Sequence, residues 1–191
     1  MFNSCSHKEL NPTDYIHWVE DESNGLHKVE EVGDLIYDVQ YKPTDYILCK
    51  TGEIDGVVSD GLLDSLRAQY DSLLYFTVTL KNSTGKDPIS QNSNSKEIEE
   101  AAIYYFQYNF QKDIYIEVVD TVKIKHTPVL FHFERMYTVN NAKVFLIAFD
   151  NTIEMKEKDL QLIIHSNYLT SGLVKFYFDK DLFVQQPRMK L

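Results

Sequence analysis

The sequence predicts a mainly β fold with helices (α+β), in which β-sandwich-like antiparallel sheets carry one or two flanking helices. Three observations lead to this prediction. Residues that favour strands are frequent, with 13 Tyr and 11 Phe among 191 residues. Many short segments alternate apolar and polar residues, and turn residues separate them, as in a β-sandwich. Two other segments show the helical spacing of apolar residues instead.

Strands are expected where apolar residues recur at every second position. The segment 34–43 alternates in this way and ends at Pro43, which cannot donate to the hydrogen-bond ladder of a strand. The segment 72–82 alternates in the same way. Asn140 and Asn141 link two later segments and suit a tight hairpin, because asparagine tolerates a positive φ angle. The other expected strands are 45–50, 114–125, 128–139, 142–150, 160–166 and 172–179.

Two helices are expected. In the segment 58–70, leucines and Tyr70 recur at helical spacing, and Asp60 is placed to cap the N-terminus of the helix. The second helix begins after Ser95 and continues through the segment 101–112. Acidic residues in its first turn favour a helix start there, because they complement the helix dipole.

The second helix also predicts a surface for protein contacts. Its apolar residues form a wide stripe, which indicates that the helix packs on a sheet. Tyr104 and Tyr108 extend this stripe into an aromatic flank. Trp18, the only tryptophan in the sequence, is expected to pack on the body of the domain. We treat Trp18, Tyr104 and Tyr108 as a candidate interaction surface, because aromatic residues are enriched in protein interfaces.

The N-terminal residues differ in composition from the rest of the chain. The segment 6–14 is polar and contains Pro12, which predicts a flexible tether over residues 1–14. We expect residues 15–191 to form a single β-rich globular domain. A chain of this length can bury a core without help from a metal ion or a disulfide.

A cysteine stands close to the beginning of this tether. Phe2-Asn3-Ser4-Cys5 resembles the end of a bacterial lipobox, in which a small residue such as Ser4 directly precedes the lipidated cysteine, although Phe2 is bulkier than the usual aliphatic residue. The composition also resembles that of Bacteroidota envelope proteins. The resemblance implies a lipid on Cys5, a signal segment outside this sequence, and a location in the bacterial cell envelope with a lipid anchor in the outer membrane. It also implies that the partners are other envelope proteins.

Charge and hydropathy limit the partners. The 19 basic and 29 acidic residues give a net charge of −10, which repels nucleic acid and anionic membrane surfaces. The sequence contains no apolar run of about 18 residues, so we expect contact with a membrane only through the lipid anchor. Cys49 lies in an apolar run and is interpreted as a small buried residue, while a disulfide between Cys5 and Cys49 stays open as an alternative.

The sequence contains few residues in patterns that indicate chemistry. His132 and Glu134 are two positions apart on an expected strand, so both project from one face, and His126 has the same parity. These three residues are the candidate metal ligands, although Pro128 interrupts the alternation and no fourth ligand follows from the spacing. Because the sequence lacks the nucleophile motifs of hydrolases, we expect no catalytic residue and no cofactor.

Three functional hypotheses follow. The first is a non-enzymatic, lipid-anchored envelope protein that acts as an accessory subunit of a larger surface or periplasmic assembly. The second is a glycan-binding surface lipoprotein, in which exposed Tyr and Trp side chains stack on sugar rings. The third is a metal-binding protein or an enzyme that uses His132 and Glu134.

Overall fold

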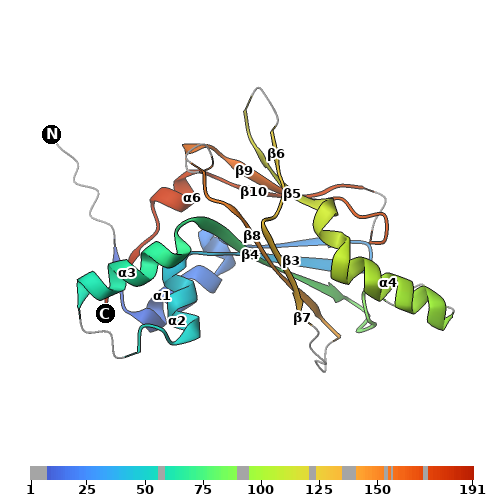
Figure 1. Cartoon of the computed structure of the whole chain (residues 1–191), viewed down its shortest axis with the longest axis horizontal. Helices are drawn as coiled ribbons and strands as arrows, with labels where there is room; N and C mark the ends of the chain where they lie inside the picture. The colour runs from blue at the N-terminus through green and yellow to red at the C-terminus, as the bar shows by residue number, and fades with distance from the viewer. Residues whose placement is uncertain are drawn as a thin grey trace.

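Two antiparallel sheets pack against each other and form the body of the protein (Figure 1). This arrangement confirms the predicted mixed fold with sandwich-like sheets. The structure is a computed structural model that describes residues 8–55, 59–89, 95–120, 124–134, 141–152, 155, 157–169 and 172–191.

The larger sheet has five strands in the order β2-β3-β4-β8-β7, and every neighbouring pair is antiparallel. Alternate residues along β3 and β4 are buried, as the period of two in the sequence predicts. In the central pairs, Val39 lies opposite Val78, and Val78 lies opposite Phe145. The strands are β2 (His27–Val32), β3 (Leu35–Lys42), β4 (Leu73–Asn82), β7 (Leu130–Glu134) and β8 (Lys143–Asp150).

The smaller sheet has four strands in the order β10-β9-β5-β6, again with antiparallel neighbours. The prediction of a single strand over 114–125 is wrong, because the chain reverses after β5 and returns as β6, with Ile116 opposite His126 in an antiparallel pair. The strands are β5 (Ile114–Val118), β6 (Lys125–His126), β9 (Leu160–Ile164) and β10 (Val174–Phe178).

Aromatic side chains from both sheets meet in the core. The rings of Phe76 on β4 and Phe178 on β10 have centroids 5.4 Å apart, and those of Phe110 and Phe145 are 4.9 Å apart. All four side chains are buried. Burial of a side chain of this size contributes roughly 1.5–3 kcal/mol, so the contact between the sheets at Phe76 and Phe178 and the contact of Phe110 with β8 are a major source of stability.

The helices lie at the two ends of the sandwich (Figure 1). At one end, α1, α2 and α3 pack together, and the short helix α6 lies beside them; α4 extends from the opposite end. The helices are α1 (Pro12–Glu20), α2 (Thr44–Thr51), α3 (Asp60–Tyr70), α4 (Lys96–Tyr108) and α6 (Asp181–Val184), with 3-10 turns at Glu22–Asn24 and Phe110–Asp113.

The prediction of a strand at 45–50 is wrong, because this segment lies within α2. Tyr46 and Leu48 are buried two positions apart, which is the spacing of one face of a strand, so this short segment resembles a strand in the sequence. The flanking residues carry the better signal. Pro43 precedes the helix, and Gly52 follows it with a φ angle of 75°, so proline at the start and glycine at the end mark a helix.

The tether over residues 1–14 was predicted too long. Residues 1–7, which include Cys5, lie outside the described residues. After them, the two-stranded parallel sheet of β1 (Glu9–Leu10) and β11 (Arg188–Met189) joins the two ends of the described chain. The Asn11 side chain then caps α1 by accepting a hydrogen bond of 2.9 Å from the backbone N–H of Asp14. Pro12 therefore begins a helix here, which is its favoured place in a helix.

The other predicted elements agree with the structure within a few residues. The helix at 58–70 is α3, although its N-cap residue is Ser59 rather than Asp60. The predicted strand 128–139 begins at Leu130, and residues 135–140 lie outside the described residues. Asn141 has a φ angle of 52°, as expected for a turn residue.

Candidate functional site

Helix α4 projects from the sandwich, and its first half is exposed to solvent on all sides (Figure 1). Its start is well defined, because the Ser95 hydroxyl accepts a hydrogen bond from the backbone N–H of Ile98. Glu97 and Glu99 in the first turn complement the helix dipole. Every residue from Ser95 to Ala101 is exposed, so the sandwich itself does not cover this part of the helix.

The second half of α4 is held firmly. Ala102 and Phe106 are its buried residues. The Phe106 ring lies 5.1 Å from the ring of Phe110 and 6.2 Å from that of Phe145, measured between centroids. These contacts connect the helix to β8 of the larger sheet. The C-terminal half of α4 thus acts as the base from which the N-terminal half extends.

A hydrogen-bonded network at the base of α4 fixes its orientation. The Tyr105 hydroxyl donates a hydrogen bond to the Asp113 carboxylate and lies 2.6 Å from the Ser166 hydroxyl, which is fully buried. Burial raises the pKa of Tyr105, and the Asp113 carboxylate raises this pKa further. The phenol is therefore protonated at neutral pH and serves as a donor rather than as a general base. This chemistry suits a structural clamp between α4 and the segment after β9.

Two tyrosines form an exposed aromatic pair on α4. Tyr104 and Tyr108 are 60% and 51% exposed, and their ring centroids are 5.0 Å apart with a tilt of 48° between the planes. Ala101 lies on the same side of the helix, at the spacing of three and seven residues. We name Ala101, Tyr104 and Tyr108 the aromatic face of α4. This face combines rigid apolar area with two phenol groups that can hydrogen-bond a partner.

A third exposed tyrosine borders the aromatic face. The Tyr168 ring stacks on the Tyr105 ring with 4.1 Å between centroids, and Tyr168 is 52% exposed. Sequence reasoning missed Tyr168, because it stands alone in the turn after β9 and only the fold brings it to α4. In the sequence, the one sign of a functional role for Tyr168 was that an aromatic residue stands alone among turn residues.

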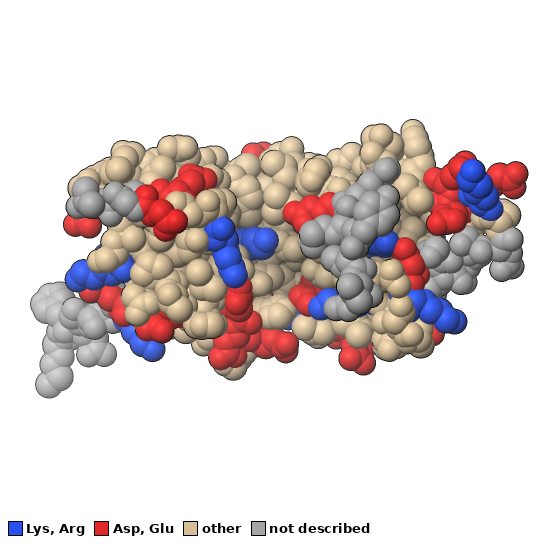
Figure 2. All heavy atoms as spheres, turned by 90° about the horizontal axis from the view of Figure 1, so that it is seen from below, with Lys and Arg blue, Asp and Glu red and all other residues tan. Residues whose placement is uncertain are grey.

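Acidic side chains surround the free end of α4. Glu97, Glu99 and Glu100 are all exposed, and Lys96 lies 3.7 Å from Glu100 in an exposed ion pair. Figure 2 shows the acidic side chains gathered at this end of the molecule. Glu97 lies four residues before Ala101, so the aromatic face ends in a negative charge.

Trp18 does not belong to this surface. It lies on α1 at the opposite end of the molecule (Figure 1). Its side chain is partly buried against the core, and its ring stacks at 6.5 Å from the ring of Tyr15. The structure therefore brings Tyr104 and Tyr108 together and leaves Trp18 in a packing role.

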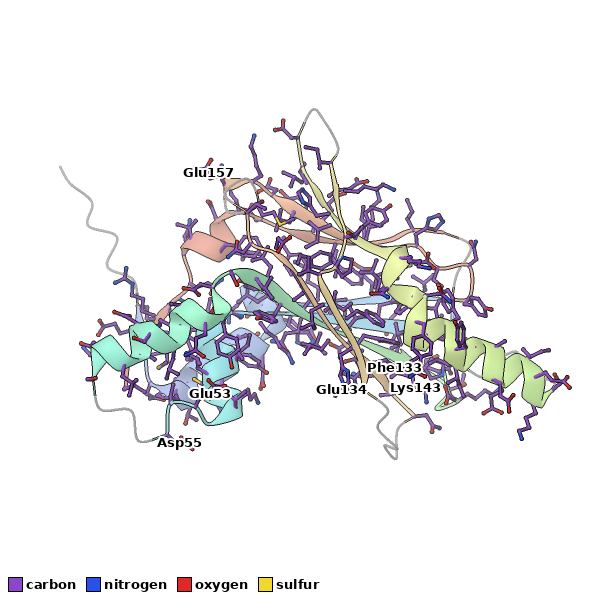
Figure 3. The ribbon with its side chains drawn as sticks, viewed as in Figure 1. Glu53, Asp55, Phe133, Glu134, Lys143 and Glu157 are labelled. Atoms are coloured by element: carbon purple, nitrogen blue, oxygen red, sulfur yellow. The ribbon has the colours of Figure 1, made fainter. Side chains whose placement is uncertain are left out.

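The three candidate metal ligands are not assembled into a site. His132 and Glu134 lie on β7 of the larger sheet, whereas His126 lies on β6 of the smaller sheet. Figure 3 shows Glu134 near Phe133 and Lys143 at the end of the β7–β8 pair. Among the described residues, no group of three or more His, Cys, Asp or Glu side chains is arranged to hold a metal ion. The Nε2 atom of His126 is buried and has no hydrogen-bond partner among the described residues.

Only one of the two cysteines lies within the described residues. Cys5, the expected lipid-attachment residue, lies outside the described residues. Cys49 lies on α2 with a free thiol and packs partly buried against the core, rather than on the predicted strand. Burial raises the pKa of this thiol to about 11, so it stays protonated and unreactive at neutral pH.

In the described parts of the chain, no helix has both the length and the apolar character needed to cross a bilayer.

No protein-family model matches the sequence, and no curated protein matches it. Two solved structures are similar over most of their lengths. A novel protein of unknown function from Burkholderia pseudomallei has a TM-score of 0.38 and 13% identity, covering 93% of this chain and 93% of its own. A DUF4426 family protein from Pseudomonas aeruginosa has a TM-score of 0.38 and 9% identity, covering 81% of this chain and 94% of its own. Similarities at this level carry no argument about fold or function.

Proposed function

We propose that this protein is a non-enzymatic accessory subunit of a bacterial envelope assembly, which it joins through the aromatic face of α4. The observation that supports the proposal is the exposed pair of Tyr104 and Tyr108 on a helix that projects from the sandwich. Tyrosine is enriched in interfaces because it offers a large contact area at a low cost in side-chain entropy.

The shape of α4 suits a partner that surrounds the helix. The residues 95–101 are exposed on every side, so a groove in another protein can accept this half of the helix without moving the sandwich. The base of the helix is fixed by buried contacts and by the Tyr105 network. A rigid, already folded helix loses little entropy on binding, which favours affinity.

Charge defines the chemistry of the partner. Glu97, Glu99 and Glu100 surround the free end of the helix, and Lys96 is the one basic residue in its first turn. The whole chain has a net charge of −10. We therefore expect an apolar groove with basic residues at its rim, because complementary charge steers association and excludes wrong partners.

The place in the envelope rests on the sequence rather than on the fold. The resemblance of residues 2–5 to a lipobox supports Cys5 as the anchor. An acidic body is compatible with such an anchor, because it is repelled from an anionic membrane surface and remains free to meet a partner. A diacylated or triacylated cysteine provides durable anchoring, since more than one acyl chain is present.

The geometry favours protein contact over glycan binding. A sugar-binding platform needs flat aromatic surfaces that face the same way, whereas the rings of Tyr104 and Tyr108 are tilted by 48°. The third hypothesis, a metal-binding protein or an enzyme, has less support, because His126 lies on a different sheet from His132 and Glu134.

The proposal is tested by site-specific photo-crosslinking in native cells. A photoreactive phenylalanine analogue at position 104 is expected to give one dominant adduct with an envelope protein. The matched control places the same analogue at Tyr177, which is also exposed but lies on β10 of the smaller sheet. Identical adducts from both positions, or no adduct from position 104, would contradict the proposed interface.

A charge-reversal variant sharpens the test. Glu97→Lys and Glu100→Lys together are expected to abolish the adduct from position 104, because they remove the expected charge complementarity. Both side chains are exposed, so the sandwich should be unaffected, and circular dichroism checks that α4 remains helical without the favourable charge of Glu97 in its first turn. The anchor is tested separately by mass spectrometry of the protein isolated from its native cells, in which an acylated N-terminal Cys5 supports the envelope location.

A further inference from the structure

A cleft lies at the end of the molecule opposite α4. Its volume is about 570 Å³, within the range of small-ligand sites. Residues of α1, α2 and α3 form one side, and the C-terminal segment around Phe183 and Arg188 forms the other. The aromatic face of α4 has no part in this cleft, so the inference below is independent of the proposed function.

One wall of the cleft is a rigid ion-pair network. The Arg67 guanidinium binds the Asp45 carboxylate with distances of 2.6 Å from Nε and 2.9 Å from Nη2. Its Nη1 atom lies 3.2 Å from Asp64, and Nη2 also donates to the backbone oxygen of Met189 at 3.2 Å. Arg67 thus uses four of its five N–H donors to bind Asp45, Asp64 and the backbone of β11. Its main role is to shape the cleft.

Two tyrosine side chains line the cleft. Tyr15 and Tyr41 are 2% and 9% exposed, and both line the cleft. No hydrogen bond connects either hydroxyl to another residue in the described part of the chain. Burial raises the pKa of both phenols, and nearby carboxylates raise these values further, so both remain neutral donors. Neither hydroxyl is among the buried polar atoms without a partner, so both are open to the cleft and free to hydrogen-bond a molecule that enters it.

The cleft also presents two opposite charges that are not paired. The Asp71 carboxylate accepts a hydrogen bond of 2.7 Å from the Thr44 hydroxyl, but it forms no ion pair with the described residues. The exposed side chain of Arg188 likewise has no ion pair there, since β11 uses only the backbone of this residue. A single ligand with one positive and one negative group would satisfy both.

Apolar surface lies beside these charges. Phe183 and Val184 line the cleft, and the Phe183 ring meets the Tyr41 ring edge-on at 5.1 Å. A smaller adjoining cavity of about 240 Å³ shares Tyr41, Phe183 and Val184 with the cleft and is lined further by Leu74 and Met155. An apolar side chain of a ligand can therefore extend from the charged region toward the core.

We infer that this cleft binds a short peptide with free termini. The peptide ammonium group faces Asp71, the peptide carboxylate faces Arg188, an apolar side chain lies against Phe183, and the hydroxyls of Tyr15 and Tyr41 bond the peptide backbone. A neutral sugar would leave the charges of Asp71 and Arg188 unmatched. A simple anion or cation would satisfy only one of them.

The test uses a tripeptide library with free termini and the same library acetylated at the N-terminus and amidated at the C-terminus. Binding to the full chain is measured by native mass spectrometry and by calorimetry on the best member. We expect the blocked form of that member to bind at least about tenfold more weakly, the loss that corresponds to about 1.4 kcal/mol. The trisaccharide maltotriose serves as a neutral ligand of similar size and is expected not to bind.

Variants assign each contact. Arg188→Gln should remove the discrimination against the C-terminal amide, and Asp71→Asn should remove the discrimination against the N-terminal acetyl group. The matched control is Lys190→Gln, two residues from Arg188, because Lys190 pairs with Glu9 outside the cleft. Tyr41→Phe should weaken binding while the unliganded protein is no less stable, because the lost hydroxyl had no partner.

Several outcomes would overturn the inference. Equal binding of free and blocked peptides would show that the charges play no part. Binding of maltotriose in preference to every tripeptide would assign a different ligand class. The absence of binding by any tripeptide up to about 10 mM, beyond the affinity range of specific sites, would remove the site itself.

Discussion

The Arg67 guanidinium and the Asp45 carboxylate face each other in a bidentate pair, with distances of 2.6 and 2.9 Å. This pair joins α3 to α2, and both side chains are largely buried. A bidentate arginine pair of this kind is stronger than a single hydrogen bond and fixes the relative orientation of the two helices. It also borders the cleft, so the stability of the protein and the shape of the cleft depend on the same contact.

Replacement of Arg67 by lysine is expected to destabilise the protein by about 1–3 kcal/mol, because lysine keeps the charge but lacks the planar fork. Urea unfolding measures the loss. The control is Lys190→Gln, since Lys190 and Glu9 form an exposed pair whose removal should change the free energy of unfolding by less than about 1 kcal/mol. A loss for Arg67→Lys no larger than that of the control would mean that the fork geometry is unimportant.

Acid stability is expected to depend on Asp38. Its carboxylate accepts hydrogen bonds from Lys81 at 2.6 Å and from His27 at 2.8 Å. Burial alone would raise the pKa of Asp38, but the bonds from Lys81 and His27 outweigh burial, and the pKa is lowered. A lowered pKa in the folded state stabilises the protein above the unfolded pKa of about 4, and this contribution is lost as the pH falls through the folded value.

The Asp38 prediction is tested with Asp38→Asn. The wild-type protein should lose free energy of unfolding as the pH falls below about 4, and the variant should show a smaller loss over the same range. Asp179→Asn is the control, because Asp179 is exposed and forms no ion pair with the residues that the structure describes. Parallel pH profiles of the wild type and Asp38→Asn would exclude Asp38 as the titrating group.

Most of the strands and helices could be predicted from the sequence. The alternation in 34–43 and 72–82 is strong, because one face of each strand is fully buried while the other is not. The helix α2 was misread because Tyr46 and Leu48 alternate over too few residues to separate the two periods. Pro12 was interpreted as a residue that prevents regular structure, although a proline directly after Asn11 is typical of the start of a helix.

The residues of the candidate sites were harder to predict from the sequence. Tyr104 and Tyr108 were identified correctly as neighbours, because one helix positions both. Tyr168 and the cleft were missed, since the contacts that create them join segments far apart in the chain. Asp45 and Arg67, for example, belong to different helices, and only tertiary packing brings them together.

Two glycines offer a matched test of the end of α2 and the interior of α3. Gly52 ends α2 with a φ angle of 75°, whereas Gly61 lies inside α3 with open space around it. Gly52→Ala should cost about 1 kcal/mol, because a side chain is strained in the left-handed region. Gly61→Ala should stabilise the protein by roughly 0.5–1 kcal/mol through helix propensity. Effects of equal sign in thermal unfolding would contradict the helix end at Gly52.

The hydrogen-bonded network of Tyr105 should control how firmly α4 is held. Tyr105→Phe removes the hydroxyl that bonds Asp113 and Ser166 and leaves the buried Ser166 hydroxyl with one partner fewer. The expected loss is about 1–3 kcal/mol, the usual cost of a buried polar group left unsatisfied. Hydrogen exchange should become faster in the second half of α4, where the backbone is otherwise protected by packing.

The control for Tyr105 is its neighbour on the same helix. Tyr104→Phe removes a hydroxyl from a side chain that is 60% exposed, so the free energy of unfolding and the exchange rates of α4 should not change. The two variants make the same chemical change one residue apart, and the structure predicts a loss of stability for Tyr105→Phe and no change for Tyr104→Phe. If Tyr105→Phe also left exchange in α4 unchanged, the clamp would have to lie in the apolar contacts of Phe106 alone, and the network would have no role in presenting the aromatic face.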